Sequence, residues 1–235
     1  MTASEPRYRH LVFDFDHLLF DTDSSEADAL ATTLRAHGVD NPHDLLDTYQ
    51  QINRALWHRV ELGEITPNEV KSQRFEELAD AANLDYDADS VADDYTRGLA
   101  AHGALYDGVA DMLATLAETH RFSMVTNGIG SVQRGRLQRL GIDDAFDPLI
   151  ISGEVGVAKP HADIFELVFA AHPDTPRNNF VMIGDSLTSD IQGGTNAGID
   201  TCWYDRHGVG LDPGGGRVVP THVISRLADL PYVVS

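Results

Sequence analysis

The stretch LVFDFD at residues 11–16 joins a short apolar run to two aspartates. Its first three residues have the length and composition of a buried β-strand, and the acidic residues come where such a strand ends. Because successive side chains of an extended chain point to opposite sides, we expect Asp14 and Asp16 on the same side. The stretch therefore predicts a buried strand with two carboxylates at its carboxyl end.

Further apolar runs of strand length follow, and each leads into a polar or glycine-containing turn. They are residues 122–125, 149–151 and 180–183, and later runs at 201–204 and 221–224 could add two edge strands. Apolar residues at helical spacing fill 131–140 and 162–171, between these strands. Strands that alternate with helices predict an α/β fold, a Rossmann-like doubly wound parallel sheet with helices on both faces.

Residues 22–103 interrupt this alternation, since they contain no convincing strand and their apolar residues recur at helical spacing. Three or four helices are expected here. One should begin at Thr66, because Pro67 suits a first turn and Glu69 completes a capping box. The sequence thus predicts a core domain of residues 1–21 and 104–235, with a helical domain of residues 22–103 inserted after the first strand.

Polar residues gather where the strands of the expected sheet end, which is where open parallel sheets bind ligands. They are Asp14 and Asp16, then Thr126, Asn127 and Gly128, then Lys159, then Asp185 with Asp190 after it. Carboxylates at close quarters repel one another, and a divalent cation that prefers oxygen ligands, such as Mg²⁺, removes that repulsion. Such a site leaves room for a phosphate oxygen, with Lys159 and Thr126 as further donors.

Charge and composition exclude several classes of protein. The chain of 235 residues carries 37 acidic and 17 basic residues, a formal net charge of −20. This sign disfavours binding to nucleic acid, and no apolar run approaches the ~20 residues of a membrane helix. The single cysteine, Cys202, excludes an intramolecular disulfide and a cysteine-based zinc site. The polar N-terminal stretch lacks the apolar region of a secretory signal, so we expect a cytoplasmic protein.

The basic residues are unusual in kind, with two lysines, Lys71 and Lys159, against fifteen arginines. An acidic, lysine-poor composition is typical of halophilic proteins, in which high intracellular salt screens self-repulsion. An acidic protein from a low-salt cytoplasm is the alternative. A glycine-rich stretch at residues 212–216 predicts a surface loop.

Four motifs, in this order, resemble those of the haloacid dehalogenase (HAD) superfamily of phosphotransferases. They are FDFD at 13–16 with FDT at 20–22, VTNG at 125–128, VAKP at 157–160, and IGDSLTSDI at 183–191 with NAGI at 196–199. The resemblance covers essentially the whole core, and the helical insertion looks like the small helical (C1) cap of that superfamily. The segment from Thr126 to Lys159, and DTCW at 200–203, are particularly similar to the pyrimidine 5′-nucleotidase branch.

The resemblance implies a Mg²⁺-dependent phosphomonoesterase that acts on a small phosphorylated metabolite, such as a nucleoside 5′-monophosphate. Asp14 is expected to be the nucleophile that forms an aspartyl-phosphate, and Asp16 the general acid and base. The metal ligands are expected to be Asp14, Asp185 and the main-chain carbonyl of Asp16, with Asp190 acting through a water molecule.

The same resemblance assigns phosphate binding to Thr126, Asn127 and Lys159. Thr126 and Lys159 are also expected to stabilise the charge that develops during phosphoryl transfer. Neither the cap residues that select the substrate nor the oligomeric state can be read from the sequence.

Other activities stay open beside this one. A carboxylate at Asp16 favours phosphate chemistry over a 2-haloacid dehalogenase, which displaces halide and needs no acid there. Phosphatases for phosphoglycolate or sugar phosphates, and a phosphomutase, remain alternatives. His17 and Leu18 depart from the usual motif, in which a small or polar residue and then Thr or Val follow the second Asp, and Leu18 cannot donate a hydrogen bond as Thr does. A non-catalytic protein that binds a phosphorylated ligand is therefore a further alternative.

Overall fold

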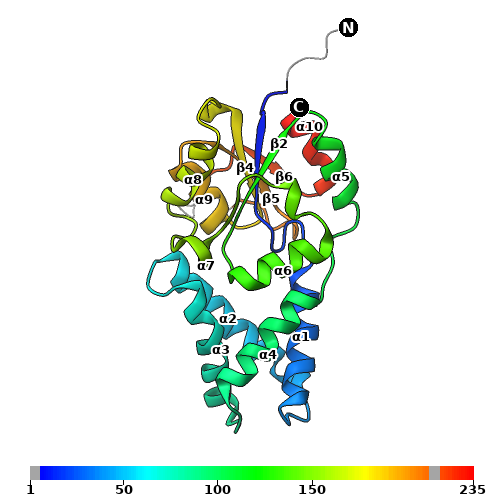
Figure 1. The fold of residues 1–235 in the computed structure, drawn as a ribbon, viewed down its shortest axis with the longest axis vertical. Coiled ribbons are helices and arrows are strands. Elements are labelled where there is room, and N and C mark those ends of the chain that lie inside the picture. The colour runs from blue at the N-terminus through cyan, green and yellow to red at the C-terminus, as the bar shows by residue number, and fades with distance from the viewer. Residues whose placement is uncertain (1–5, 212–217) are drawn as a thin grey trace.

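The computed structural model describes residues 6–211 and 218–235. A sheet flanked by helices lies at one end of its long axis, and the helices α1–α4 lie at the other (Figure 1). The loop expected at residues 212–216 lies outside the described residues. Among those described, no helix combines the length and the hydropathy that crossing a membrane requires.

The sheet is parallel throughout, with the strand order β3-β2-β1-β4-β5-β6. Its strands are β1 (His10–Phe13), β2 (Arg121–Thr126), β3 (Leu149–Ile151), β4 (Phe180–Gly184), β5 (Asp200–Tyr204) and β6 (His222–Ile224). The predicted α/β Rossmann-like fold is confirmed. Both expected late strands exist, but only β6 lies at the edge, because β5 pairs with β4 as well as with β6.

Helices cover both faces of this sheet. They are α5 (Val109–Leu116), α6 (Gly130–Leu140), α7 (Ser152–Val155), α8 (Asp163–Ala171), α9 (Gln192–Asn196) and α10 (Leu230–Val234). Short turns complete the chain: 3₁₀ helices at Pro42–Leu45, Asp143–Ala145, Arg177–Asn179 and Leu227–Asp229, and a π-helical turn at Leu187–Ile191. Neither α5 nor α10 is among the helices predicted from the sequence.

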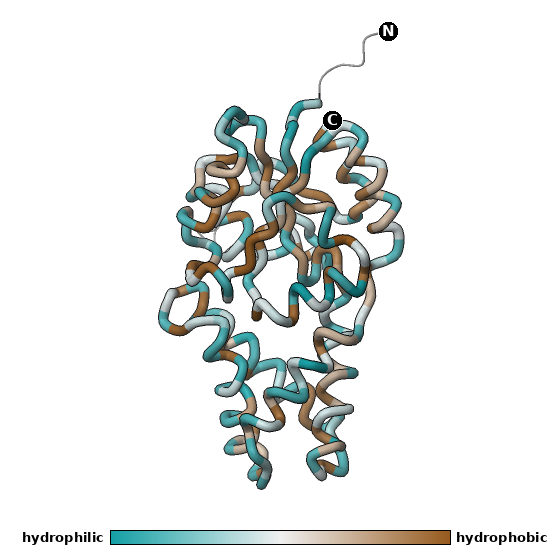
Figure 2. Tube along the Cα trace, viewed as in Figure 1, coloured by the Kyte–Doolittle hydropathy of each residue, from teal (hydrophilic) through white to brown (hydrophobic). Residues whose placement is uncertain are grey.

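The alternation of side chains along β1 divides the core between the two faces. Leu11 and Phe13 pack with residues of α5, α6 and α10, whereas Val12 packs with residues of α8 and with Ala197 and Ile199, which follow α9. All three are fully buried, and hydrophobic residues run along the central strands (Figure 2). Burial on both faces is what a central parallel strand requires, and it explains why the first stretch is apolar without a polar alternation.

The helical insertion consists of α1 (Thr22–Ala36), α2 (Leu46–Glu61), α3 (Pro67–Ala82) and α4 (Ala88–Ala101). The capping box expected at the start of α3 is present, with the Thr66 side chain accepting from the N–H of Glu69. The helices share an apolar core of their own, which also contacts Ile129 and Val132 beside and within α6. The insertion thus rests on the sheet-bearing part through α6. Its division from that part at residues 22–103 stays a prediction.

Candidate active site

The carboxyl ends of β1 and β4 meet where the strand order reverses, since β2 and β3 continue from β1 while β5 and β6 continue from β4. Open α/β sheets bind ligands in the crevice at such a point. Asp14 directly follows β1, and its N–H donates to the carbonyl of Ile183 on β4 at 2.9 Å. Asp185 directly follows β4. The topology therefore brings the first and fourth motifs to the same edge.

Lys159 is a buried cation between two carboxylates, with 1% of the residue exposed. Its Nζ donates to Asp14 Oδ1 at 2.6 Å and to Asp190 Oδ1 at 2.7 Å. The Asn127 side chain donates to the Lys159 carbonyl and accepts from its N–H, both at 2.9 Å. Burial alone would lower the pKa of Lys159, but the two carboxylates outweigh it and raise that pKa above its usual value. Lys159 therefore stays charged beside Asp14.

Asp14, Asp185 and Asp190 form an acidic cluster, in which one carboxylate oxygen of each lies within 4.8 Å of the others. Burial raises the pKa of Asp14 and of Asp185, the neighbouring carboxylates raise it further, and Lys159 opposes both. A divalent cation with oxygen ligands would offset the burial and the repulsion, so these residues fit Mg²⁺. The carboxylate of Asp16 stands outside the cluster, and only its main-chain carbonyl is expected as a ligand.

A glycine at the end of β4 lets Asp190 reach the cluster. A Cβ on Gly184 would lie 2.1 Å from Asp190 Oδ2, which is closer than real side chains approach. Asp190 belongs to the π-helical turn, and its Oδ2 accepts from the N–H of Ser186 at 3.0 Å. Any side chain at position 184 would therefore displace a carboxylate that holds Lys159.

Three donors fix the carboxylate of Asp16, which has 22% of its side chain exposed. Thr22 Oγ1 donates to its Oδ1 at 2.9 Å, and Arg136 Nη1 donates to the same oxygen at 2.8 Å. Gln133 Nε2 donates to its Oδ2 at 2.5 Å. The carboxylate is held in one orientation by three residues to which the sequence analysis assigns no such role.

The unusual pair His17-Leu18 has a structural explanation. His17 adopts a left-handed conformation, with φ +59°, in the turn after Asp16, and Leu18 is fully buried in the core. Thr22 supplies a hydroxyl instead, since it donates to Asp16 and accepts from the N–H of His17 at 3.1 Å. The departure from the usual motif therefore leaves Asp16 with a hydroxyl partner.

Arg136 on α6 connects Asp16 to the helical insertion, and 3% of its side chain is exposed. Its Nε donates to the carbonyl of Leu99 on α4 at 3.0 Å, and its Nη2 donates to Ser25 Oγ on α1 at 3.4 Å. Its guanidinium also lies over the Phe20 ring, 4.4 Å from the centroid. A displacement of α1 or α4 would therefore be transmitted to the carboxylate of Asp16.

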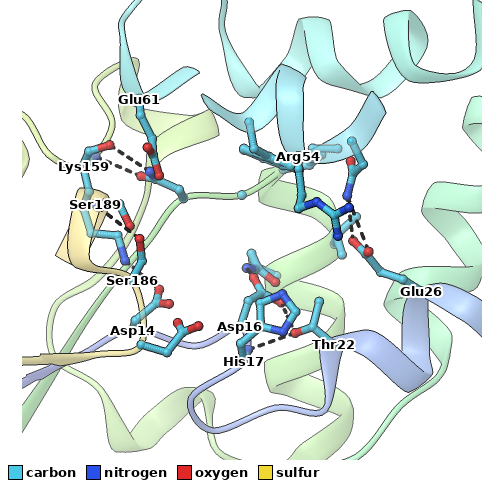
Figure 3. Close-up of a pocket in the computed structure, with 18 of the residues that line it drawn as sticks. Asp14, Asp16, His17, Thr22, Glu26, Arg54, Glu61, Lys159, Ser186 and Ser189 are labelled. Carbon is cyan, nitrogen blue, oxygen red and sulfur yellow. Dashed lines mark hydrogen bonds and ion pairs between the residues drawn. The ribbon is translucent and has the colours of Figure 1, made fainter. Parts of the chain in front are cut away.

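A cavity of about 460 Å³ lies between the strand ends and the helical insertion. The predicted site residues on its core wall are Asp14, Asp16, Asn127, Lys159 and Asp185. Figure 3 shows Asp14, Asp16 and His17 along this wall. Thr126 does not line the cavity, because it is fully buried and its Oγ1 accepts from Gln133 Nε2 at 3.0 Å.

The opposite wall, here called the cap wall, comes from the helical insertion. Its residues on α2 recur at three- and four-residue spacing on one face: Gln50, Asn53, Arg54, Trp57, His58 and Glu61. Glu26 of α1 and Arg74 of α3 also line it, and Arg54 points from α2 into the open space (Figure 3). The sequence predicts the helix but not this role, because an amphipathic helix has a polar face whether it meets solvent or a ligand.

Known proteins resemble this chain over most of its length. The family model for haloacid dehalogenase-like hydrolases matches residues 11–204. HAD-hydrolase YfnB of Bacillus subtilis is 32% identical over 97% of this chain and 96% of its own length. Pyrimidine 5′-nucleotidase PynA of Streptococcus pneumoniae is 38% identical over 85% of each chain. Pyrimidine 5′-nucleotidase YjjG of Escherichia coli is 32% identical over 95% of this chain and 96% of its own.

Solved structures share the fold. A structure of YfnB from Bacillus subtilis bound to magnesium matches with a TM-score of 0.88 and 32% identity, over 97% of this chain and 99% of the other. The L-2-haloacid dehalogenase of Xanthobacter autotrophicus matches with a TM-score of 0.72 and 22% identity, over 97% and 98%. With the parallel sheet and the four motifs at its strand ends, these matches establish that the chain belongs to the haloacid dehalogenase-like hydrolase family.

Proposed function

We propose that this protein is a Mg²⁺-dependent phosphomonoesterase that hydrolyses a small phosphorylated metabolite through an aspartyl-phosphate on Asp14. The observation that carries the proposal is the position of the Asp14 carboxylate. It accepts from the buried Lys159 ammonium at 2.6 Å and shares a 4.8 Å cluster with Asp185 and Asp190. The adjoining cavity, of about 460 Å³, is large enough for a small metabolite.

In the first step, an Asp14 carboxylate oxygen attacks phosphorus, and the bond from phosphorus to the oxygen of the leaving alcohol breaks. Asp16 donates a proton to that oxygen. Lys159 stabilises the charge on the phosphoryl oxygens from a position that Asn127 and Asp190 fix. Thr126 stays a proposed phosphate contact, although its hydroxyl is buried against Gln133 rather than open to the cavity.

In the second step, water attacks phosphorus and the bond to the Asp14 oxygen breaks, which releases phosphate and restores the carboxylate. Asp16, now deprotonated, takes the proton from the attacking water. Both steps need Asp16 in the same place, and its three hydrogen-bond donors hold it there.

Mg²⁺ would be held by the carboxylates of Asp14 and Asp185 and by the main-chain carbonyl of Asp16, with Asp190 supporting it through water. When bound, the cation supplies positive charge that offsets these carboxylates and the charge of the transferring phosphoryl group.

We propose a nucleoside 5′-monophosphate as the substrate, because pyrimidine 5′-nucleotidases are among the relatives that align with most of this chain. A phosphoglycolate or sugar-phosphate phosphatase would prefer phosphoglycolate or a sugar phosphate to nucleoside monophosphates. A phosphomutase would convert a sugar phosphate to its isomer without net release of phosphate. A dehalogenase is disfavoured, since halide displacement does not need an acid at Asp16. A non-catalytic role would give binding of a phosphate analogue without turnover.

The test is phosphate release from an aryl phosphate and from a panel of nucleoside monophosphates, with Mg²⁺ present. Asp14→Asn should reduce turnover by about 10⁴-fold or more, because it removes the nucleophile. EDTA should suppress turnover, and added Mg²⁺ should restore it. Asp163→Asn, an exposed aspartate outside the cavity, is the matched control and should behave as wild type. Full activity of Asp14→Asn or in EDTA would refute the mechanism.

We also propose that the protein works in a cytoplasm of high salt, because of its net charge of −20. Repulsion among surface charges weakens when salt shortens the Debye length to about 3 Å at 1 M. The melting temperature is therefore expected to rise between low and molar KCl. A higher melting temperature at low salt would contradict this adaptation and leave the proposed activity untouched.

A further inference from the structure

Arg206 orients the imidazole of His17. It stands two residues after β5, and its Nη1 lies 3.0 Å from His17 Nδ1. A guanidinium only donates hydrogen bonds, so Nδ1 accepts this one and the proton of the neutral ring lies on Nε2. The carboxylate of Asp23 accepts from Arg206 Nη2 at 2.7 Å and lies farther from the ring, 3.5 Å from Nδ1. Arg206 therefore fixes both the direction of the ring and its tautomer.

The other ring nitrogen of His17, Nε2, is open. His17 lines the cavity and has 34% of its side chain exposed, whereas Arg206 does not line the cavity. The two nitrogens of an imidazole point in different directions, so Nε2 points away from Arg206. Nε2 has no partner among the described residues, and it is not one of their buried polar atoms. His17 thus adds to the core wall an N–H donor that no described residue accepts.

The main chain fixes the position of His17 relative to Asp16. His17 adopts a left-handed conformation, which is costly for a side chain of this size and persists only where the surroundings hold it. Its N–H donates to Thr22 Oγ1 at 3.1 Å, and the same hydroxyl donates to Asp16 (Figure 3). Because Asp16 is proposed to protonate the oxygen of the leaving alcohol, the donor of His17 lies beside that alcohol.

We infer that His17 is a specificity-determining residue, whose Nε2–H donates to a hydroxyl or ether oxygen of the leaving group, and that Arg206 is its positioning residue. The inference rests on the proposed function, because it concerns the alcohol that Asp16 protonates. It assigns the substrate to the phosphate esters of sugars, since a sugar carries oxygen acceptors on the carbons next to its ester. A simple alkyl alcohol offers no such acceptor.

Ribose 5-phosphate and butyl phosphate separate this recognition from the chemistry. Both release a primary alcohol, so both need the proton from Asp16, and both present the same phosphoryl group to Lys159. Only the ribose offers oxygen acceptors beyond the ester oxygen. The readout is the kcat/KM for ribose 5-phosphate divided by that for butyl phosphate, here called the sugar preference. A contact of His17 with the phosphoryl group would change both values equally and would overturn the inference.

The decisive variant is His17→Asn. Asn tolerates the left-handed conformation, and its Oδ1 can accept from Arg206 in place of Nδ1, but its side chain is too short to replace Nε2. We expect the sugar preference to fall by about 3- to 10-fold, as for the loss of one hydrogen bond, and the kcat/KM for butyl phosphate to stay within about two-fold. An unchanged sugar preference, or equal losses on both phosphates, would overturn the inference.

His43→Asn is the matched control for this variant. His43 is also bonded to an arginine, with its Nε2 at 2.6 Å from Arg35 Nη2, but it is exposed on the helical insertion and does not line the cavity. Its sugar preference should equal that of wild type. A fall as large as in His17→Asn would show that the change does not come from the cavity, and would overturn the inference.

Arg206→Gln tests the positioning role. Without the guanidinium, Asp23 becomes the nearest partner of Nδ1 and accepts a proton from it, so Nε2 of the neutral ring no longer donates. The sugar preference should fall in this variant, but it should not fall further when Arg206→Gln is added to His17→Asn, because the two residues act through one contact. A further fall in the double variant would overturn the role of Arg206. Arg226→Gln, which removes an exposed arginine paired with Asp229, should leave the preference unchanged.

Melting temperatures show whether each variant folds, and Arg206→Gln keeps the inference testable if His17→Asn does not fold. Calorimetric binding of the two phosphates, with Mg²⁺ present, measures recognition without turnover. Ribose 5-phosphate should bind His17→Asn about 3- to 10-fold more weakly than wild type, and butyl phosphate should bind both alike. Equal affinity of the two proteins for ribose 5-phosphate would overturn the inference. A protein that binds ribose 5-phosphate through His17 but releases no phosphate would contradict only the proposed function.

Discussion

The two walls of the cavity differ in how their charged groups are balanced. On the core wall, Lys159 contacts two carboxylates, and Asp16 accepts from three donors. On the cap wall, the Nε and Nη2 atoms of Arg74 are buried without a hydrogen-bond partner, and Arg54 makes no hydrogen bond or ion pair within the described residues. Lys159 and Asp16 on the core wall are therefore paired within the protein, whereas Arg74 and Arg54 on the cap wall have nitrogens without a partner among the described residues.

We propose that this difference reflects two tasks, chemistry on the core wall and selection of the ligand on the cap wall. Groups that stabilise a transition state are most effective when they are already oriented, because reorganisation then costs nothing during the reaction. Groups that select a ligand gain discrimination when they are unsatisfied until the right ligand binds. Substitutions on the core wall are therefore expected to change kcat, and those on the cap wall to change KM.

Lys159→Met should give the largest effect of the variants on the core wall outside the nucleophile. It removes a cation from the transferring phosphoryl group, so kcat should fall by about 10²- to 10³-fold. It also leaves Asp14 and Asp190 buried without their partner, which should lower the free energy of unfolding by about 3–5 kcal/mol. Steady-state kinetics and chemical denaturation measure the two effects.

Lys71→Met is the matched control, because Lys71 is the only other lysine in the sequence and pairs with the exposed Asp93 on the surface of the helical insertion. An exposed ion pair contributes about 0–1 kcal/mol, so kcat and stability should stay close to wild type. If Lys159→Met and Lys71→Met changed kcat and the free energy of unfolding by similar amounts, the pairing of Lys159 with Asp14 and Asp190 would not matter for activity or stability.

Arg136→Gln should have the next largest effect, as a positioning residue for Asp16. We expect kcat to fall by about 10- to 100-fold for an alkyl phosphate, which needs a proton on its leaving oxygen, and less for p-nitrophenyl phosphate, which does not. Arg139→Gln is the control, since Arg139 donates to the carbonyls of His102 and Gly103 and does not contact Asp16. Equal losses on both substrates would show that Arg136 only supports the fold.

The core wall was largely predictable because its residues follow apolar runs. Asp14 and Asp185 stand directly after buried strands, and parallel strands place such positions at one edge of the sheet. The sequence carries no comparable signal for the side chains that donate hydrogen bonds to Asp16. Gln133 and Arg136 lie more than a hundred residues later in a helix, and nothing in their local sequence indicates that they reach Asp16.

The missed helix α5 is a different case, because its signal was present. Val109, Met112, Leu113 and Leu116 are buried and recur at helical spacing, which is enough to predict an amphipathic helix. The residues of the cap wall could not be predicted in this way. Asn53 and Arg74 lie on different helices, and only the packing of α2 against α3 brings them to one wall.

Arg54→Ala should give the smallest effect of the variants that compare the core wall with the cap wall. Arg54 is exposed and has no partner among the described residues, so we expect it to attract the proposed phosphorylated substrate through a screened charge. Such a charge contributes about 0.2–1 kcal/mol, which corresponds to a rise in KM of about 1.4- to 5-fold at low salt. In molar KCl the rise should vanish, because the Debye length falls to about 3 Å. Arg59→Ala, on the same helix but outside the cavity, controls for loss of charge alone. A loss of kcat that persists at high salt would instead place Arg54 in contact with the reacting phosphoryl group, and the cap wall would then share in the chemistry.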